Sequence, residues 1–176
     1  METALPIDRA LVLTAATGSA VAIASQGTRG GQPSRRFRKR LIRAGQYVKA
    51  SDGLKFGVDG ALRVLGEKDK QVLMTSLRDD AADAGGDVDG SAVPPAPGDW
   101  KGVYFQSGSN DRLSQVKNLV LRYPVIGMQF TDVSPTVEGA RISDTSDLGI
   151  SCEGSAKPTL TDVTYSHTGH GDTNCH

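Results

Sequence analysis

The segment 78–98 holds the densest group of carboxylates in this sequence. It contains five aspartates: Asp79, Asp80, Asp83, Asp87 and Asp89. Carboxylate oxygens at alternate positions ahead of a glycine are typical of calcium-binding loops. The spacing departs from an EF-hand, because its first ligand position would be Gly85 and its twelfth Ala96. We therefore expect either a looser calcium site on Asp83, Asp87 and Asp89 or a solvated acidic loop.

A second candidate site is a ladder of polar residues that recurs once per repeat. Its members are Tyr104, Gln129, Ser151 and Asn174. The next row of the same face consists of Gln106, Thr131, Glu153 and His176. These side chains can hydrogen-bond to sugars and stack on them, but only Glu153 is a carboxylate, whereas glycoside hydrolysis uses a pair. The ladder therefore favours ligand binding over acid–base catalysis, and a solvated sheet face is the plain alternative.

A column of ionisable residues near the C-terminus is a third candidate. It comprises Tyr123, Asp144 and His167, with Asp147 and His170 nearby. A stacked aspartate and histidine can act as a base or a metal ligand. Such residues are also common at turns, so a structural role is the alternative.

The run Arg35–Arg43 is strongly basic and could contact nucleic acid or anionic lipid through its arginines and Phe37. The whole chain is balanced, with 20 Lys and Arg against 20 Asp and Glu. No global field therefore draws it to a polyanion. We expect a basic segment without structure here, and no nucleic-acid partner.

The elements that position these residues follow from an internal repeat. Segments beginning at Val116, Val137 and Leu160 each carry apolar residues at their first, fourth and sixth places. One helix or one straight strand cannot place all three on one face. Two short strands joined by a bend can. The bend falls at the third place, which is occupied by Asn118, Gly139 and Asp162, types that tolerate a left-handed backbone.

A second repeated strand alternates apolar and polar residues. The alternation places Val103, Phe105 and the corresponding residues of the following coils inward. It places the ladder outward. The predicted strands are 102–106, 115–117, 119–122, 127–131, 136–138, 140–143, 149–152 and 159–165. The sequence thus predicts an all-β chain in which short strands stack in parallel coils.

This pattern resembles the right-handed parallel β-helix repeat proteins, the pectin-lyase-like superfamily in its broad sense. The similarity lies in the stretch GDWKGVYF (98–105), the Gly-Ile strand start at 149, the Ser-Pro-Thr turn at 134 and the Asp/Gly-rich loop before Trp100. The resemblance covers roughly 54–176. It implies a right-handed parallel β-helix but no particular activity, because this architecture hosts lyases, hydrolases, adhesins and structural domains.

We divide the chain into two regions. Residues 1–45 are an irregular, arginine-rich segment, in which Ala10–Ala24 resembles a weak signal peptide. Residues 46–176 form the coils, with the loop 78–98 inserted between them. The last coil is predicted to present an uncapped edge suited to end-to-end association. No apolar run reaches the length of a membrane span.

The two cysteines, Cys152 and Cys175, fall one coil apart in the inward column. A disulfide suits an exported protein, and buried thiols suit a cytosolic one. Because an interior column of small apolar residues needs no covalent bond, the sequence favours thiols.

The function expected from the sequence is that of a non-catalytic β-helix scaffold or binding module of a surface or secreted protein. Its partner would be polysaccharide or another protein, with calcium as the candidate cofactor. The alternative is a fragment of a polysaccharide lyase or glycoside hydrolase. The extracellular or cell-surface location follows from the family resemblance.

Overall fold

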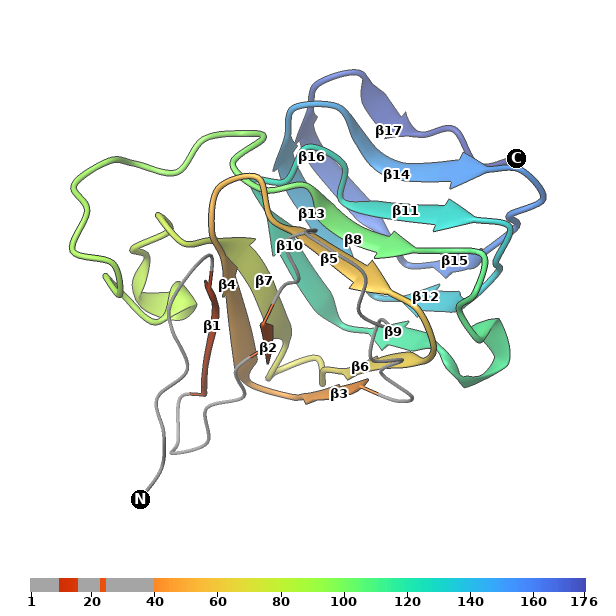
Figure 1. The fold of residues 1–176 in the computed structure, drawn as a ribbon, viewed down its shortest axis with the longest axis horizontal. Coiled ribbons are helices and arrows are strands. Elements are labelled where there is room, and N and C mark those ends of the chain that lie inside the picture. Colours follow the sequence, from red (N-terminus) through yellow and green to blue (C-terminus); the bar gives the residue numbers. More distant parts are fainter. Residues whose placement is uncertain (1–9, 16–22, 25–39) are drawn as a thin grey trace, which may run out of the picture.

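The computed structural model describes residues 10–15, 23–24 and 40–176, of which residues 40–176 form a parallel β-solenoid (Figure 1). Each coil gives one strand to each of three sheets, which we call sheets I, II and III. Strands of successive coils pair in parallel within each sheet. The predicted architecture is therefore confirmed.

The sheets contain the following elements. Sheet I consists of β1 (Ala10–Ala15), β2 (Ile23–Ala24), β4 (Gln46–Ala50), β7 (Val72–Ser76), β10 (Leu119–Arg122), β13 (Arg141–Thr145) and β16 (Thr164–Thr168). Sheet II consists of β5 (Lys55–Val58), β8 (Gly102–Phe105), β11 (Met128–Thr131), β14 (Leu148–Glu153) and β17 (Gly171–Thr173). Sheet III consists of β3 (Arg40–Arg43), β6 (Leu62–Leu65), β9 (Gln115–Lys117), β12 (Thr136–Glu138) and β15 (Thr159–Thr161). Two short 3-10 helices, η1 (Ala82–Ala84) and η2 (Asp111–Leu113), lie in loops.

The apolar residues that define the repeat form the core between the three sheets. Val116, Leu119, Leu121, Val137, Ala140 and Ile142 are each at most 1% exposed. In the inward column of sheet II, the rings of Phe105 and Phe130 have centroids 5.1 Å apart. Each coil buries its apolar face only against its neighbours, so the stack has one continuous core.

The bends lie where the repeat predicts them. Asn118, Gly139 and Asp162 all have positive φ, at 47°, 66° and 51°. The stretch predicted as one strand over 159–165 is accordingly divided into β15 and β16 at Asp162. The side-chain amide of Asn118 donates to the carbonyl of Gly66 at 2.9 Å, which links the bend to the preceding coil.

Gly139→Ala is expected to lower the free energy of unfolding by about 2 kcal/mol, and Gly53→Ala by about 1 kcal/mol. Both glycines have a positive φ, at 66° and 67°. A methyl group at Gly139 would lie 2.5 Å from Oδ1 of Asn118, whereas one at Gly53 would meet nothing within 4 Å. Moving Asn118 away would strain its bond to Gly66. Urea denaturation of both variants checks this, and equal losses would contradict it.

The stack begins earlier than the first residue assigned to the coils, Gln46. Strand β3 pairs in parallel with β6, and Ile42 is buried. Of the signal-like stretch, β1 and β2 are described, and β1 pairs antiparallel with β4. The rest of that stretch and the arginines before Arg40 lie outside the described residues. No helix within the described ranges combines the length and apolar character needed to cross a membrane.

The segment 78–98 is an insertion between β7 and β8 and projects beside sheet I (green in Figure 1). Its first part is anchored rather than free, because Asp79 is 2% exposed and Ala84 is fully buried. The remainder, from Asp87 to Pro97, is largely exposed.

The cysteines form a disulfide, so the prediction of buried thiols is wrong. Cys152 and Cys175 are bonded, with Cα atoms 5.1 Å apart. The error lies in treating their column as sealed interior. Both residues are only partly buried. Among the described residues, the coil that contains β15, β16 and β17 packs against a neighbouring coil on one side only. Leu160 of that coil is also only partly buried, whereas Val137 one coil earlier is fully buried.

Candidate functional site

The predicted polar ladder lies on the outer face of sheet II. Tyr104, Gln129 and Ser151 are in-register neighbours on β8, β11 and β14. Ser151 is only 5% exposed, and the side chain of Asn174 is engaged, since its Oδ1 accepts from the amide of Cys152 at 2.7 Å. The Lys55 ammonium lies 5.0 Å from the centroid of the Tyr104 ring. Tyr104 and Gln129 are therefore the ladder members most available to a ligand.

The predicted calcium ligands are not gathered in one place. Carboxylate oxygens of Asp80, Asp87 and Asp89 lie within 4.8 Å of one another, and all three residues are exposed. Oδ1 of Asp87 already accepts from the backbone amides of Asp89 and Gly90. Asp83 lies apart from this group, because it binds Arg122.

The Asp–His column is assembled, with each histidine contacting an aspartate of the preceding coil. Nδ1 of His167 lies 3.1 Å from Oδ1 of Asp144, and Nδ1 of His170 lies 3.0 Å from Oδ1 of Asp147. Both imidazoles are at least 76% exposed. These pairs link the last two coils at their surface.

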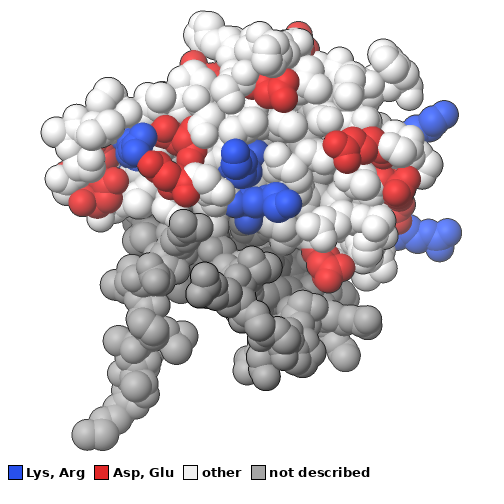
Figure 2. All heavy atoms as spheres, turned by 45° about the horizontal axis from the view of Figure 1, so that its top comes forward, with Lys and Arg blue, Asp and Glu red and all other residues white. Residues whose placement is uncertain are grey.

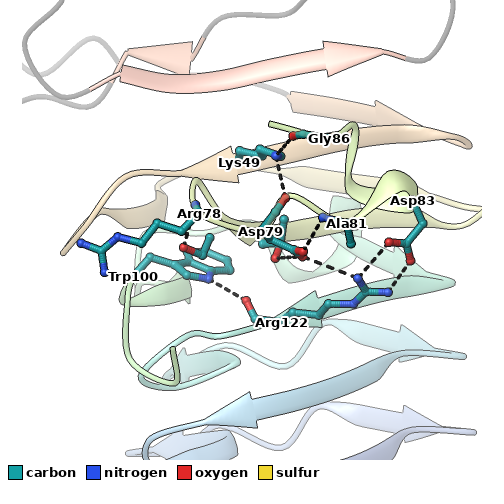
Figure 3. A network of polar contacts seen from close by, with 10 residues as sticks. Lys49, Arg78, Asp79, Ala81, Asp83, Gly86, Trp100 and Arg122 are labelled. Carbon is teal, nitrogen blue, oxygen red and sulfur yellow. Dashed lines mark hydrogen bonds and ion pairs between the residues drawn. The ribbon is translucent and has the colours of Figure 1, made fainter. Parts of the chain in front are cut away.

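A polar network that the sequence does not reveal fixes the start of the long loop to sheet I (Figure 3). Lys49 on β4 is completely buried, and its ammonium donates to the backbone carbonyls of Asp79 at 2.6 Å and Gly86 at 2.5 Å. The carboxylate of Asp79 accepts from the Thr75 hydroxyl at 2.6 Å and from the Ala81 amide at 3.3 Å. The segment between Asp79 and Gly86 is thus held at both ends.

Arg122 on β10 joins this network to the outer face of sheet I (Figure 3). Its guanidinium pairs with both oxygens of Asp83, at 3.2 and 2.5 Å, and lies 3.5 Å from Oδ2 of Asp79. The hydrogen bond from Arg122 lowers the pKa of Asp83, and the same bond raises the pKa of Arg122. The indole of Trp100 donates to the carbonyl of Arg122 at 2.9 Å. Asp83 is therefore ionised and held in place, and it forms one wall of a groove.

Beside this wall, sheet I has a groove of about 570 Å³, which we call the sheet I groove. One row of outward residues crosses it in register: Leu73, Val120, Arg141 and Thr164. A second row contains Arg122, Ser143 and Ser166. The groove thus combines an apolar patch, hydroxyl groups and two guanidinium groups across four consecutive strands. Concave sites with a few placed polar groups are where small molecules and sugars bind.

No protein-family model matches the chain, and no curated protein or solved structure shows significant similarity to it. The fold assignment therefore rests on the strand pairing, and the functional argument rests on the geometry of the sites.

Proposed function

We propose that the protein is a non-catalytic β-helix scaffold of a surface or secreted protein that binds polysaccharide in the sheet I groove. The observation that carries the proposal is the groove itself, lined by two in-register rows from consecutive coils and walled by a fixed loop. At about 4.8 Å per strand, four strands span roughly 14 Å, a length suited to a short stretch of a linear chain.

The groove supports binding better than hydrolysis. Glycosidases need one carboxyl group that is protonated at working pH beside a second that is ionised. The carboxylate among the described residues that line the groove is Asp83, and Arg122 holds its pKa below the ordinary value. Its proton affinity is thus shifted away from that of a general acid. The lyase or glycosidase alternative would require another site.

One observation supports the surface or secreted location in this proposal. The disulfide between Cys152 and Cys175 suits an oxidising compartment, since cytosolic thiols are kept reduced. Membership of the pectin-lyase-like superfamily is also part of this proposal. It is supported by the parallel coils and by the bend residues with a left-handed backbone conformation. Association with another protein through the edge of the last coil stays a prediction.

The test is a binding and activity screen of the purified protein against neutral and acidic polysaccharides. We expect binding without depolymerisation, and a loss of roughly tenfold in affinity for Arg141→Ala, since a hydrogen bond to a charged group contributes about 1.5–3 kcal/mol. Tyr104→Ala and Gln129→Ala are the comparison variants for sheet II. A loss of affinity confined to those two variants would assign the ligand to the ladder on sheet II. Depolymerisation by the wild type would overturn the proposal.

A further inference from the structure

An anion-binding site on this protein would need a local group of positive charges. The chain carries no net charge, and acidic and basic side chains are interspersed on the face shown in Figure 2. Two of the described arginines pair with carboxylates: Arg78 contacts Asp52 and Asp99, and Arg122 contacts Asp79 and Asp83. Two arginines without carboxylate partners at one groove are therefore the candidate for binding an anion.

Such a pair lies on the outer face of sheet III. Arg63 and Arg112 line a groove of about 410 Å³, which we call the sheet III groove. Both are exposed, and neither forms an ion pair with any carboxylate in residues 40–176. Among the described residues that line the groove, the carboxylate is Asp111, which accepts from the backbone amide of Arg112 at 2.7 Å. The described residues that line the groove thus carry two guanidinium groups and one carboxylate, which gives them a net positive charge.

The backbone holds both arginines at the same groove. Arg63 points outward from β6 because its neighbours Leu62 and Val64 are buried in the core. Arg112 belongs to η2, where Oδ1 of Asn110 accepts from the amide of Leu113 at 3.1 Å. The amide of Asn110 in turn donates to the carbonyl of Gly60 at 2.6 Å, anchoring η2 to the coil that carries Arg63.

A second link ties the far end of η2 to β6. The hydroxyl oxygen of Ser114 accepts from the amide of Leu62 at 3.2 Å, in a buried contact. The strand that carries Arg63 and the helix that carries Arg112 are therefore fixed to each other at both ends of η2. Sites whose groups are already positioned lose less entropy when a ligand binds.

Neutral donors complete the groove. Gln115 is the in-register neighbour of Arg63, and Thr136 is the neighbour of Gln115. Ser134 also lines the groove, and its oxygen accepts from the amide of Lys157 at 2.9 Å, which leaves its own hydrogen to donate. Leu113, 46% exposed, adds an apolar contact at the same groove.

We propose that the sheet III groove binds a sulfate or phosphate group carried on a larger ligand. Guanidinium groups bind tetrahedral oxyanions through paired N–H donors, and hydroxyl and amide groups serve the remaining oxygens. The apolar surface of Leu113 favours an ester on a carbon skeleton over a free ion. This site lies on a different sheet from the sheet I groove, and the two proposals stand or fall separately.

Dextran sulfate and unsulfated dextran test this proposal, because the two polymers differ only in the sulfate group. We expect the wild type to bind dextran sulfate and not dextran at the sheet III groove. The double variant Arg63→Ala/Arg112→Ala should weaken dextran sulfate binding by roughly tenfold or more, since each charged hydrogen bond contributes about 1.5–3 kcal/mol. Arg63→Lys/Arg112→Lys keeps the charge but loses the paired donors, so an intermediate affinity is expected.

The matched control is Lys68→Ala/Lys101→Ala, which removes the same charge from two exposed positions elsewhere. Equal weakening in the control and the arginine variant would overturn the proposal, because binding would then follow net charge alone. No binding of dextran sulfate and no binding of inorganic phosphate would also overturn it. Competition by millimolar inorganic phosphate would show that the group itself is recognised, and binding without competition would assign recognition to the sulfated polymer. If the alanine variant does not fold, judged by circular dichroism, the lysine variant decides.

Discussion

Replacing both cysteines by serine is expected to lower the free energy of unfolding by about 3 kcal/mol, because the bond closes a loop with a sequence separation of 23. For a domain of this size that corresponds to a fall of roughly 6–12 °C in melting temperature. The loss should be local first, since the bond closes the segment that contains β15, β16 and β17 and ties its end to β14. Hydrogen exchange should therefore accelerate in β15, β16 and β17 before it does in β10 or β11.

Reduction of the wild-type protein is the matched condition and should reproduce the double variant. Thiol titration of the denatured, unreduced protein should find no free cysteine. Two free thiols under those conditions would contradict the disulfide, and unchanged exchange in the last coil after reduction would show that side-chain packing alone holds it.

Lys49→Met is expected to cost about 3 kcal/mol, although methionine fills a similar volume. Lys49 is completely buried and donates to the carbonyls of Asp79 and Gly86. Without the ammonium group these two carbonyls lose their donor in a buried site, at about 1–3 kcal/mol each. The segment between them should loosen, and with it Asp83 and the wall of the sheet I groove.

Urea denaturation measures the loss, and limited proteolysis locates it in the segment 78–98. Lys157→Met is the control, because Lys157 is exposed and its substitution should change stability by no more than about 0.5 kcal/mol. A Lys49→Met protein as stable as this control would show that the buried charge does not anchor the loop.

The coil pattern could be predicted from sequence because its causes are local. Inward positions repeat in every coil, and the left-handed bends demand particular residue types, so Asn118, Gly139 and Asp162 mark the same phase. The ladder register on sheet II followed from the same repeat. The split at Asp162 within 159–165 was implied by the bend as well.

The sheet I and sheet III grooves could not be predicted in this way, because outward positions need not repeat. The row that crosses the sheet I groove reads Leu73, Val120, Arg141 and Thr164, four different types. The loop anchor joins Lys49 to Asp79 across a sequence separation of 30. One available signal was the position of Lys49, a charged residue between Val48 and Ala50, which are both buried.

The prediction of thiols failed for a related reason. The prediction from the repeated inward column assumed that every coil is covered on both sides. Among the described residues, the coil that ends near Cys175 has a neighbouring coil on one side only. Burial in a solenoid depends on position along the axis as well as on phase within the coil.

The disulfide between Cys152 on β14 and Cys175, which follows β17, also has a mechanical consequence. A stack of parallel coils resists shear across its sheets but peels readily when one end is pulled, because the strands then separate one at a time. Tension applied beyond Cys175 passes through the covalent bond to Cys152, so the last coil is bypassed and the load falls on β14 and its pairing with β11. The first hydrogen bonds to rupture would then be those of a fully packed coil, so the disulfide suits this part of the stack to bearing tension.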